Sequence, residues 1–132
     1  MAREVGLPID PPQRNVNSRF ALETAELVRA KKGERATGAF YHDVSRAFFA
    51  ERADISKREI IVPIAQRSGI SASDVEAAWR NRRFSPTVNA FIEEAHVAGA
   101  TGVPAMGWPH RRAIVGMMPA AELVRRLRNE AR

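Results

Sequence analysis

No cysteine occurs among the 132 residues of this chain. Disulfide exchange needs a thiolate nucleophile and many zinc sites need cysteine ligands, so the chain by itself has no disulfide, no thiol catalysis and no cysteine-bound metal. Histidine is scarce as well: His42, His96 and His110 lack the short spacing of metal-binding motifs, so we expect no metal site. Because no Gly-x-Ser-x-Gly turn exposes a serine either, we assign no catalytic residue.

Long apolar runs are also missing. No segment approaches the ~18 apolar residues that a membrane-spanning helix needs. Residues 1–10 include Arg3, Glu4 and Asp10 and have no apolar core of the kind that signal peptides carry. We therefore expect a cytoplasmic protein with no membrane partner.

Positive charge is in excess. The chain has 21 Lys and Arg against 15 Asp and Glu, which gives a net charge of +6. The arginines form small groups at residues 80–83, 111–112 and 125–128, without aromatic residues between them. Such groups are usually solvated faces, so we expect no nucleic-acid partner.

Apolar residues recur at three-to-four spacing through residues 17–98, which predicts a helical region. The predicted helices cover about residues 17–32, 38–50, 56–67, 71–80 and 85–98. Gly33 and Gly99 stand where glycine ends a helix, Ser56 with Glu59 forms a capping box, and Pro63 predicts a kink in the third helix. In the fifth helix the pattern points four residues inward: Val88, Phe91, Ile92 and Ala95.

Residues 99–132 follow a different pattern. Gly-Ala-Thr-Gly-Val-Pro at residues 99–104 ends the helical region, and a proline can only begin a strand or sit at its edge. We predict a cis bond at Val103–Pro104, a short strand after it, a turn at residues 108–111, a second strand at 113–115 and a final helix opened by Pro119. Residues 1–16, which hold three prolines, are predicted to be an extended segment before one domain at 17–132.

These residues resemble a known family. Gly-x-x-Gly-Val-Pro, a strand, a turn, a strand that ends in Gly, and a helix of the form Pro-x-x-Glu-Leu are similar to the C-terminal half of a DsbA-like thioredoxin-fold domain. The helical segments, including Phe-Tyr-His at 40–42 and Asp-Ile-Ser at 54–56, resemble the helical insertion of the cytoplasmic FrnE branch and of the related 2-hydroxychromene-2-carboxylate isomerases. The resemblance covers about residues 15–130. It implies an α+β fold, mostly α, with a helical part at 17–98 and a thioredoxin-like hairpin and helix at 99–132.

The chain also departs from this family. A complete member begins with a strand, a Cys-x-x-Cys turn and a helix, or with Ser in place of the first Cys in the isomerases, and none of these is present. We therefore expect a truncated DsbA-family thiol-disulfide oxidoreductase homologue that is not catalytic by itself. The alternatives are a binding or assembly module completed by a second chain, and a glutathione-binding, isomerase-like protein.

The candidate site is the loop of Thr101, Gly102, Val103 and Pro104. The resemblance implies that the Val103 backbone binds an extended peptide or glutathione, and glutathione is the one cofactor that it allows. The alternative is that Pro104 only sets the geometry of the turn. Because a lone hairpin is marginal in water and an unpaired strand edge recruits another strand, we expect a homodimer or a partner chain that completes the sheet.

Overall fold

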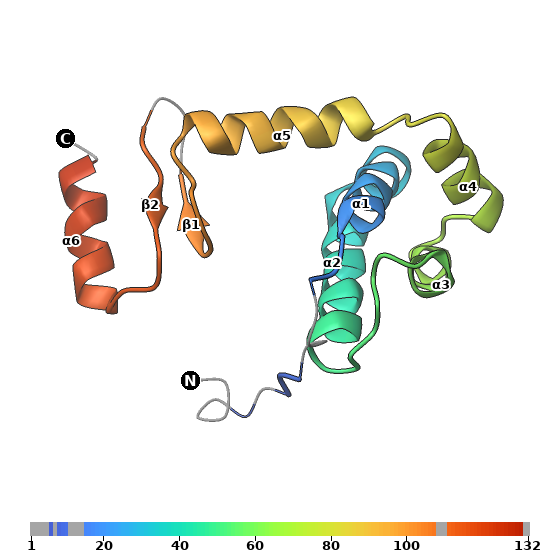
Figure 1. Cartoon of the computed structure of the whole chain (residues 1–132), viewed down its shortest axis with the longest axis horizontal. Helices are drawn as coiled ribbons and strands as arrows, with labels where there is room; N and C mark the ends of the chain where they lie inside the picture. The colour runs from blue at the N-terminus through green and yellow to red at the C-terminus, as the bar shows by residue number, and fades with distance from the viewer. Residues whose placement is uncertain (1–5, 7, 11–14, 108–110, 131–132) are drawn as a thin grey trace. The chain divides into compact units, whose positions relative to one another are not determined.

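Figure 1 shows the computed structural model, which describes residues 6, 8–10, 15–107 and 111–130. The elements within these residues are α1 (Arg19–Lys32), α2 (Glu34–Phe49), α3 (Arg58–Arg67), α4 (Ala72–Arg80), α5 (Ser85–Val97), β1 (Ala105–Met106), β2 (Ile114–Val115) and α6 (Ala120–Glu130). The chain divides into two compact units, unit 1 (Met1–Val88) and unit 2 (Asn89–Arg132). The predicted fold class, mostly helical with a small antiparallel hairpin, is confirmed.

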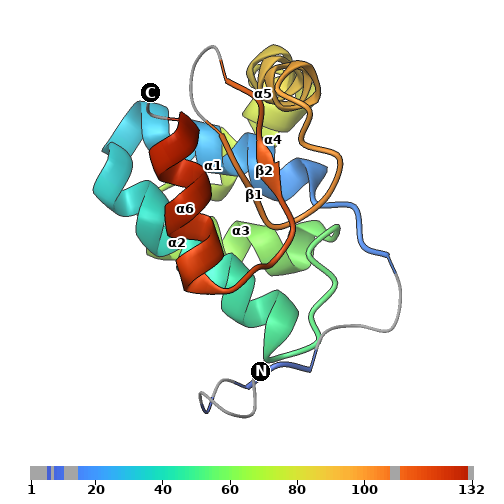
Figure 2. The same ribbon diagram turned by 90° about the vertical axis from the view of Figure 1, so that its left-hand side faces the viewer.

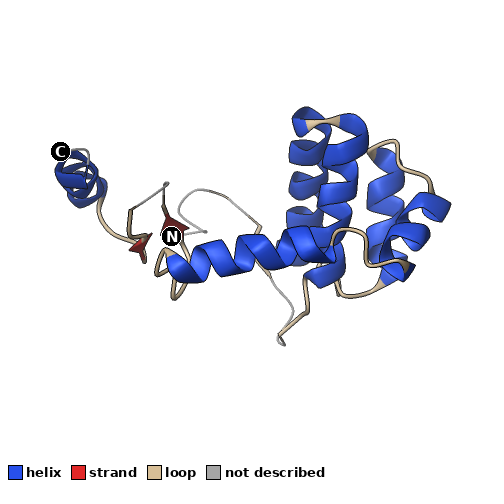
Figure 3. Cartoon of the chain, turned by 90° about the horizontal axis from the view of Figure 1, so that it is seen from above, coloured by secondary structure: helices blue, strands red, loops and turns tan. Residues whose placement is uncertain are grey.

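Unit 1 is a bundle in which α1 contacts α2, α3 and α4. Figure 3 shows helices joined by short loops in this part of the chain. The core combines side chains that are almost fully buried: Leu27 and Val28 from α1, Phe40 from α2, Ile61 from α3 and Val75 from α4. Each large apolar side chain buried in this way contributes about 1.5–3 kcal/mol, so unit 1 has a core of its own.

The first two helices meet at Gly33, which has a φ of 82°. α1 ends there as predicted, but the prediction that α2 begins near residue 38 was wrong. The carbonyl of Gly33 accepts both the N–H of Thr37, at 3.2 Å, and its hydroxyl, at 3.0 Å. These bonds let α2 begin at Glu34, directly after the glycine, although residues 34–37 carry little apolar periodicity.

The start of α3 also differs from the prediction. Ser56 does not cap the helix: the N-cap position falls one residue later, and the N–H and hydroxyl of Ser56 donate to Oδ1 of Asp54. The residue at the N-cap is Lys57, whose side chain makes no capping bond. Pro63 lies inside α3, which continues past it to Arg67; the kink stays a prediction.

At the start of α4, Ser71 caps the helix, since its Oγ accepts the N–H of Asp74 at 3.1 Å. Further along α4, Nε1 of Trp79 donates to Oγ1 of Thr24 at 3.0 Å. The Trp79 ring also lies 4.7 Å from the ring of Phe20, centroid to centroid. These two contacts fasten α4 to α1.

The end of α5 is as predicted, but its buried face is not. Gly99, at a φ of 78°, donates to the carbonyl of His96 at 2.9 Å, and Ala100 donates to that of Ala95 at 2.9 Å, which is the glycine-terminated Schellman pattern. Val88 is buried, whereas Phe91 is 52% and Ile92 is 42% exposed; Ala95 is exposed too. The apolar stripe identifies one face of a helix, but whether anything covers that face depends on tertiary packing.

Unit 2 holds the second part of α5, the hairpin and α6. The strands are antiparallel, with Ala105 opposite Val115 and Met106 opposite Ile114, and Figure 2 shows β1, β2 and α6. The expected turn at residues 108–111 lies mostly outside the described residues, which resume at Arg111. α6 begins at Ala120, after Pro119, whose carbonyl accepts the N–H groups of Glu122 and Leu123.

Candidate functional site

The predicted site residues form the loop between α5 and β1. Thr101, Gly102, Val103 and Pro104 are all exposed, and the Val103 side chain is 93% exposed. The Val103–Pro104 bond is cis, as predicted. The structure therefore keeps this loop open to solvent at the entrance to β1.

The hydrogen bonds of the hairpin decide which backbone groups of β1 are unused. Gly116 donates to the carbonyl of Pro104 at 2.8 Å. In an antiparallel ladder, alternate residues direct both backbone groups to the same neighbour. Since Pro104 and Met106 face β2, the N–H and C=O of Ala105 point to the opposite edge, where no described backbone group bonds to them. That edge is able to accept a further strand.

The outer edge of β2 is different. There the N–H of Ala113 donates to the carbonyl of Ala98 at 2.7 Å, just after α5. A groove of about 330 Å³ is lined by residues of α5 and of the hairpin. It is lined mostly by small side chains: Ala95, Ala98, Ala100, Ala105, Gly107 and Ala113, with Phe91 and Glu94 from α5. Ala105 of β1 thus lines an apolar groove.

Unit 2 has very little core around this edge. Among its described residues, Ile114 at 8% exposure is the only buried hydrophobic side chain. α6 has an apolar face of Leu123, Val124 and Leu127, but Val124 is 45% exposed. In the described part of the chain, α6 makes no close backbone contact with another element. Apolar side chains of unit 2 such as Val124 therefore stay exposed, because the described residues of the unit do not cover them.

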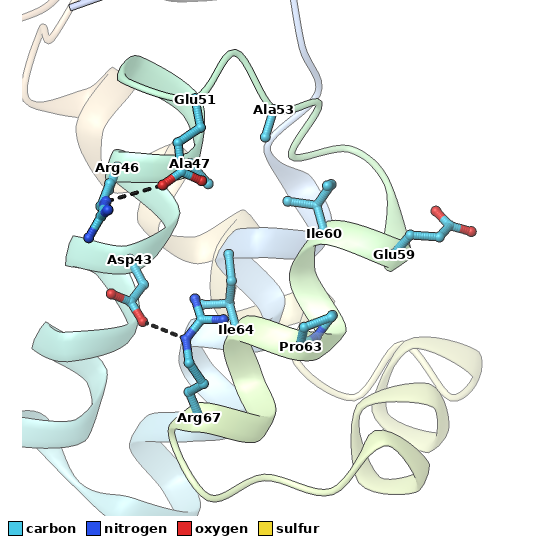
Figure 4. Close-up of a pocket in the computed structure, with 10 residues that line it drawn as sticks. All are labelled: Asp43, Arg46, Ala47, Glu51, Ala53, Glu59, Ile60, Pro63, Ile64 and Arg67. Atoms are coloured by element: carbon cyan, nitrogen blue, oxygen red, sulfur yellow. Dashed lines mark hydrogen bonds and ion pairs between the residues drawn. The ribbon is translucent and has the colours of Figure 1, made fainter. Parts of the chain in front are cut away.

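A second candidate is the groove of about 440 Å³ between α2 and α3 in unit 1, shown in Figure 4. Its floor is apolar, with Ala47 and Ile64 buried. Four of its five charged groups form pairs: Nε of Arg67 lies 3.2 Å from Oδ2 of Asp43, and Nε of Arg46 lies 3.1 Å from Oε1 of Glu51. The Asp43–Arg67 pair joins the two helices, so we interpret this groove as part of the packing of unit 1.

A third groove, of about 600 Å³, lies where residues 8–10 cross the end of α2. Asp10 donates its N–H to the carbonyl of Phe49 at 2.5 Å and pairs with Arg52 at 2.6 Å. Ile9 and Phe49 form apolar walls, and both are about half exposed. Sequence reasoning missed both grooves of unit 1, because each depends on residues brought together from separate segments.

His42 is mostly exposed, 3.8 Å from Asp43, and no cluster of three potential ligands among the described residues is able to hold a metal ion. Burial raises the pKa of the Tyr41 hydroxyl, with the Glu26 carboxylate adding to it, so Tyr41 stays protonated at neutral pH. Within the same described residues, no helix has the length and apolar character to cross a membrane.

A thioredoxin-like hairpin preceded by helices and an exposed loop defines the class of this protein. The family model of the DSBA-like thioredoxin domain matches residues 1–128. The chain therefore belongs to the DSBA-like thioredoxin domain family, whose members are thiol-disulfide oxidoreductases. No curated protein matches it.

Proposed function

We propose that this chain is a binding module of the DSBA-like family that accepts an extended polypeptide strand along β1 and does not catalyse disulfide exchange by itself. The observation that carries the proposal is the composition of unit 2: one buried hydrophobic side chain, Ile114, beside an edge where Ala105 has no described partner. A chain without cysteine supplies no thiolate for exchange. The part of the family's site that this chain holds is therefore proposed to be a binding surface along β1.

Strand addition explains both features of the surface. Hydrogen bonds to Ala105 would hold the backbone of the incoming strand, and its alternate side chains would lie beside Ala105, which lines the apolar groove. The exposed loop at residues 101–104 directly precedes β1 in the chain, so it lies at one end of the binding surface. The family resemblance supports this reading: in a complete domain another strand lies beside the strand that follows the loop.

We further assign the chain to the FrnE branch, as a portion that holds the helical insertion and the later part of the thioredoxin fold. The helical residues quoted for that branch, such as 40–42 and 54–56, lie in unit 1, and the hairpin and α6 lie in unit 2. Its cytoplasmic location stays a prediction, which fractionation of cells that express the tagged protein tests.

A peptide-binding experiment tests the function. The probe is an end-capped peptide with Val and Thr in alternation, and the control is the same peptide with every second amide N-methylated. We expect the first peptide to bind and the second not to bind, because N-methylation removes the donors of one edge. Ala105→Pro, which removes the outward N–H and no hydrogen bond of the hairpin, should abolish binding. Equal binding of both peptides, or no binding of either, contradicts the proposal.

A further inference from the structure

We propose that unit 1 binds single-stranded nucleic acid at the turn that joins α4 to α5 (Figure 1), where Arg80, Arg82 and Arg83 lie. The surface uses residues of unit 1 only, so the inference goes beyond the proposed function and does not depend on the β1 edge. The sequence alone predicts a solvated face and no nucleic-acid partner for this group of arginines, whereas the contacts of the turn favour a binding surface.

The three arginines of this turn are exposed and carry unpaired charges. Among the described residues of unit 1, seven other basic side chains form ion pairs with Asp or Glu: Arg19, Arg29, Lys31, Arg46, Arg52, Arg58 and Arg67. In that same part of the chain, Arg80, Arg82 and Arg83 have no carboxylate at ion-pair distance. Three such charges close together attract anions.

The backbone of Arg82 has a φ of 50°, in the left-handed region that favours glycine. The N–H groups of Arg82 and Arg83 bond back to the last turn of α4 at 3.1 and 3.0 Å, in the pattern that glycine usually completes after a helix. α3 and α5 end in the same pattern, with Gly69 and Gly99 at the equivalent position. An arginine where glycine is less strained points to a role for its side chain.

A fourth guanidinium adjoins the turn through Ser85, which is 5% exposed. Nη2 of Arg19 donates to Oγ of Ser85 at 2.7 Å, and Nη2 of Arg82 donates to the same atom at 3.3 Å. The two guanidiniums therefore lie next to each other, although Arg82 has no carboxylate partner of its own among the described residues. A phosphate group suits such a pair, because it carries the opposite charge and accepts several N–H donors at once.

An exposed aromatic ring lies beside these charges. Phe20 follows Arg19 at the start of α1 and is 42% exposed. Its ring lies 4.7 Å, centroid to centroid, from the ring of Trp79, the residue before Arg80. Aromatic side chains next to basic groups stack on the bases of single strands with little regard to sequence. Phe20 thus supplies the contact that separates a single-stranded nucleic acid from other polyanions.

Fluorescence anisotropy of the full chain with a labelled oligothymidylate of about 12 nucleotides tests the inference. At about 50 mM salt we expect a dissociation constant in the micromolar range. The logarithm of the association constant should fall with the logarithm of the salt concentration with a slope of about −2, the value for three phosphate contacts on a single strand.

Two arginine variants and a matched control locate the surface. Arg82→Gly should weaken binding by about fivefold without lowering the midpoint of urea unfolding, because glycine adopts a positive φ without strain. Arg80→Gln should weaken binding by a similar factor. Arg35→Gln removes an exposed, unpaired arginine beyond the other end of α1, and it should change the dissociation constant by less than about twofold.

A variant of the ring separates nucleic acid from anions in general. Phe20→Leu keeps an apolar contact with Trp79 but removes the flat ring, so it should weaken oligothymidylate binding by at least about fivefold and leave binding of inorganic polyphosphate unchanged. No oligothymidylate binding at about 100 µM protein, or equal effects of Arg80→Gln and Arg35→Gln, overturns the inference. Binding of both probes that Phe20→Leu does not alter shows a general anion surface and overturns the assignment to nucleic acid.

Discussion

The N–H of Gly116 donates a 2.8 Å hydrogen bond to the carbonyl of Pro104. This bond fixes the register of the hairpin, and the register turns the backbone groups of Ala105 away from β2. The chain thus presents an open strand edge directly after the exposed loop at residues 101–104. The following predictions test the structure and the function argued from it.

The purified chain should not catalyse disulfide exchange. Exchange proceeds by attack of a thiolate, and the sequence contains no cysteine. In an insulin-reduction assay with dithiothreitol, we expect the rate with the protein to equal the rate of the reductant alone. Turnover above that background contradicts the absence of intrinsic activity.

Arg19 should be important for the stability of unit 1. Its Nε lies 2.7 Å from Oε1 of Glu23, and its Nη2 donates to Oγ of Ser85 at 2.7 Å. Glu23 and Ser85 are both 5% exposed, so Arg19→Met leaves a buried carboxylate without this partner. We expect a loss of about 1–3 kcal/mol in the free energy of unfolding, measured by urea titration. The exposed Arg35→Met is the control and should change stability by less than about 0.5 kcal/mol.

Removing the donor of the Trp79–Thr24 hydrogen bond should cost less stability than removing its acceptor, because only the second change leaves a polar group without a partner. Trp79→Phe removes a donor but leaves the Thr24 hydroxyl bonded to the carbonyl of Phe20 at 2.6 Å, so we expect a loss of about 1 kcal/mol. Thr24→Val leaves the indole N–H unsatisfied and should cost more, about 1–3 kcal/mol. Thermal and urea unfolding of the two variants give the order, and the reverse order contradicts this account.

Asp74 should give stability a weak dependence on pH. The Lys31 ammonium, 2.7 Å away, and then the Ser71 hydroxyl hold the pKa of the Asp74 carboxyl below its ordinary value. A lowered pKa in the folded state stabilises the fold above the ordinary Asp value of about 3.9, and this contribution is lost as pH falls through the lower folded value. Lys31→Ala should therefore lower the unfolding temperature slightly near neutral pH.

The difference between Lys31→Ala and the parent chain should disappear in acid, once the carboxyl is protonated in both. Both side chains are partly exposed, so the difference should also shrink in high salt. A difference that grows as the pH falls contradicts the proposed pair.

Much of the fold was predictable because its signals are local. Gly33 and Gly99 end helices through their own backbone conformation, and Ser71 caps α4 through a residue three positions away. Ser56 is not the cap because α3 begins two residues later, at Arg58, and the N–H and hydroxyl of Ser56 donate to Asp54. A capping motif in the sequence does not show at which residue the helix begins.

The site was only partly predictable for a related reason. The loop at residues 101–104 was recognisable from its pattern, but the outward direction of Ala105 depends on a register that no local signal sets. Periodicity likewise assigned Phe91 to a buried face, whereas it is 52% exposed beside the groove. Those two residues carry much of the function proposed here, and both depend on what packs around them.

Amide hydrogen exchange at two adjacent residues tests the central claim most directly. Met106 faces β2 inside the hairpin, and Ala105 faces the open edge. The account predicts that the amide of Met106 is protected at every protein concentration. The amide of Ala105 should exchange quickly in the free protein and become protected when the alternating Val-Thr peptide is added. Protection of Ala105 in the free protein, or none when the peptide is added, contradicts a strand-binding edge at β1.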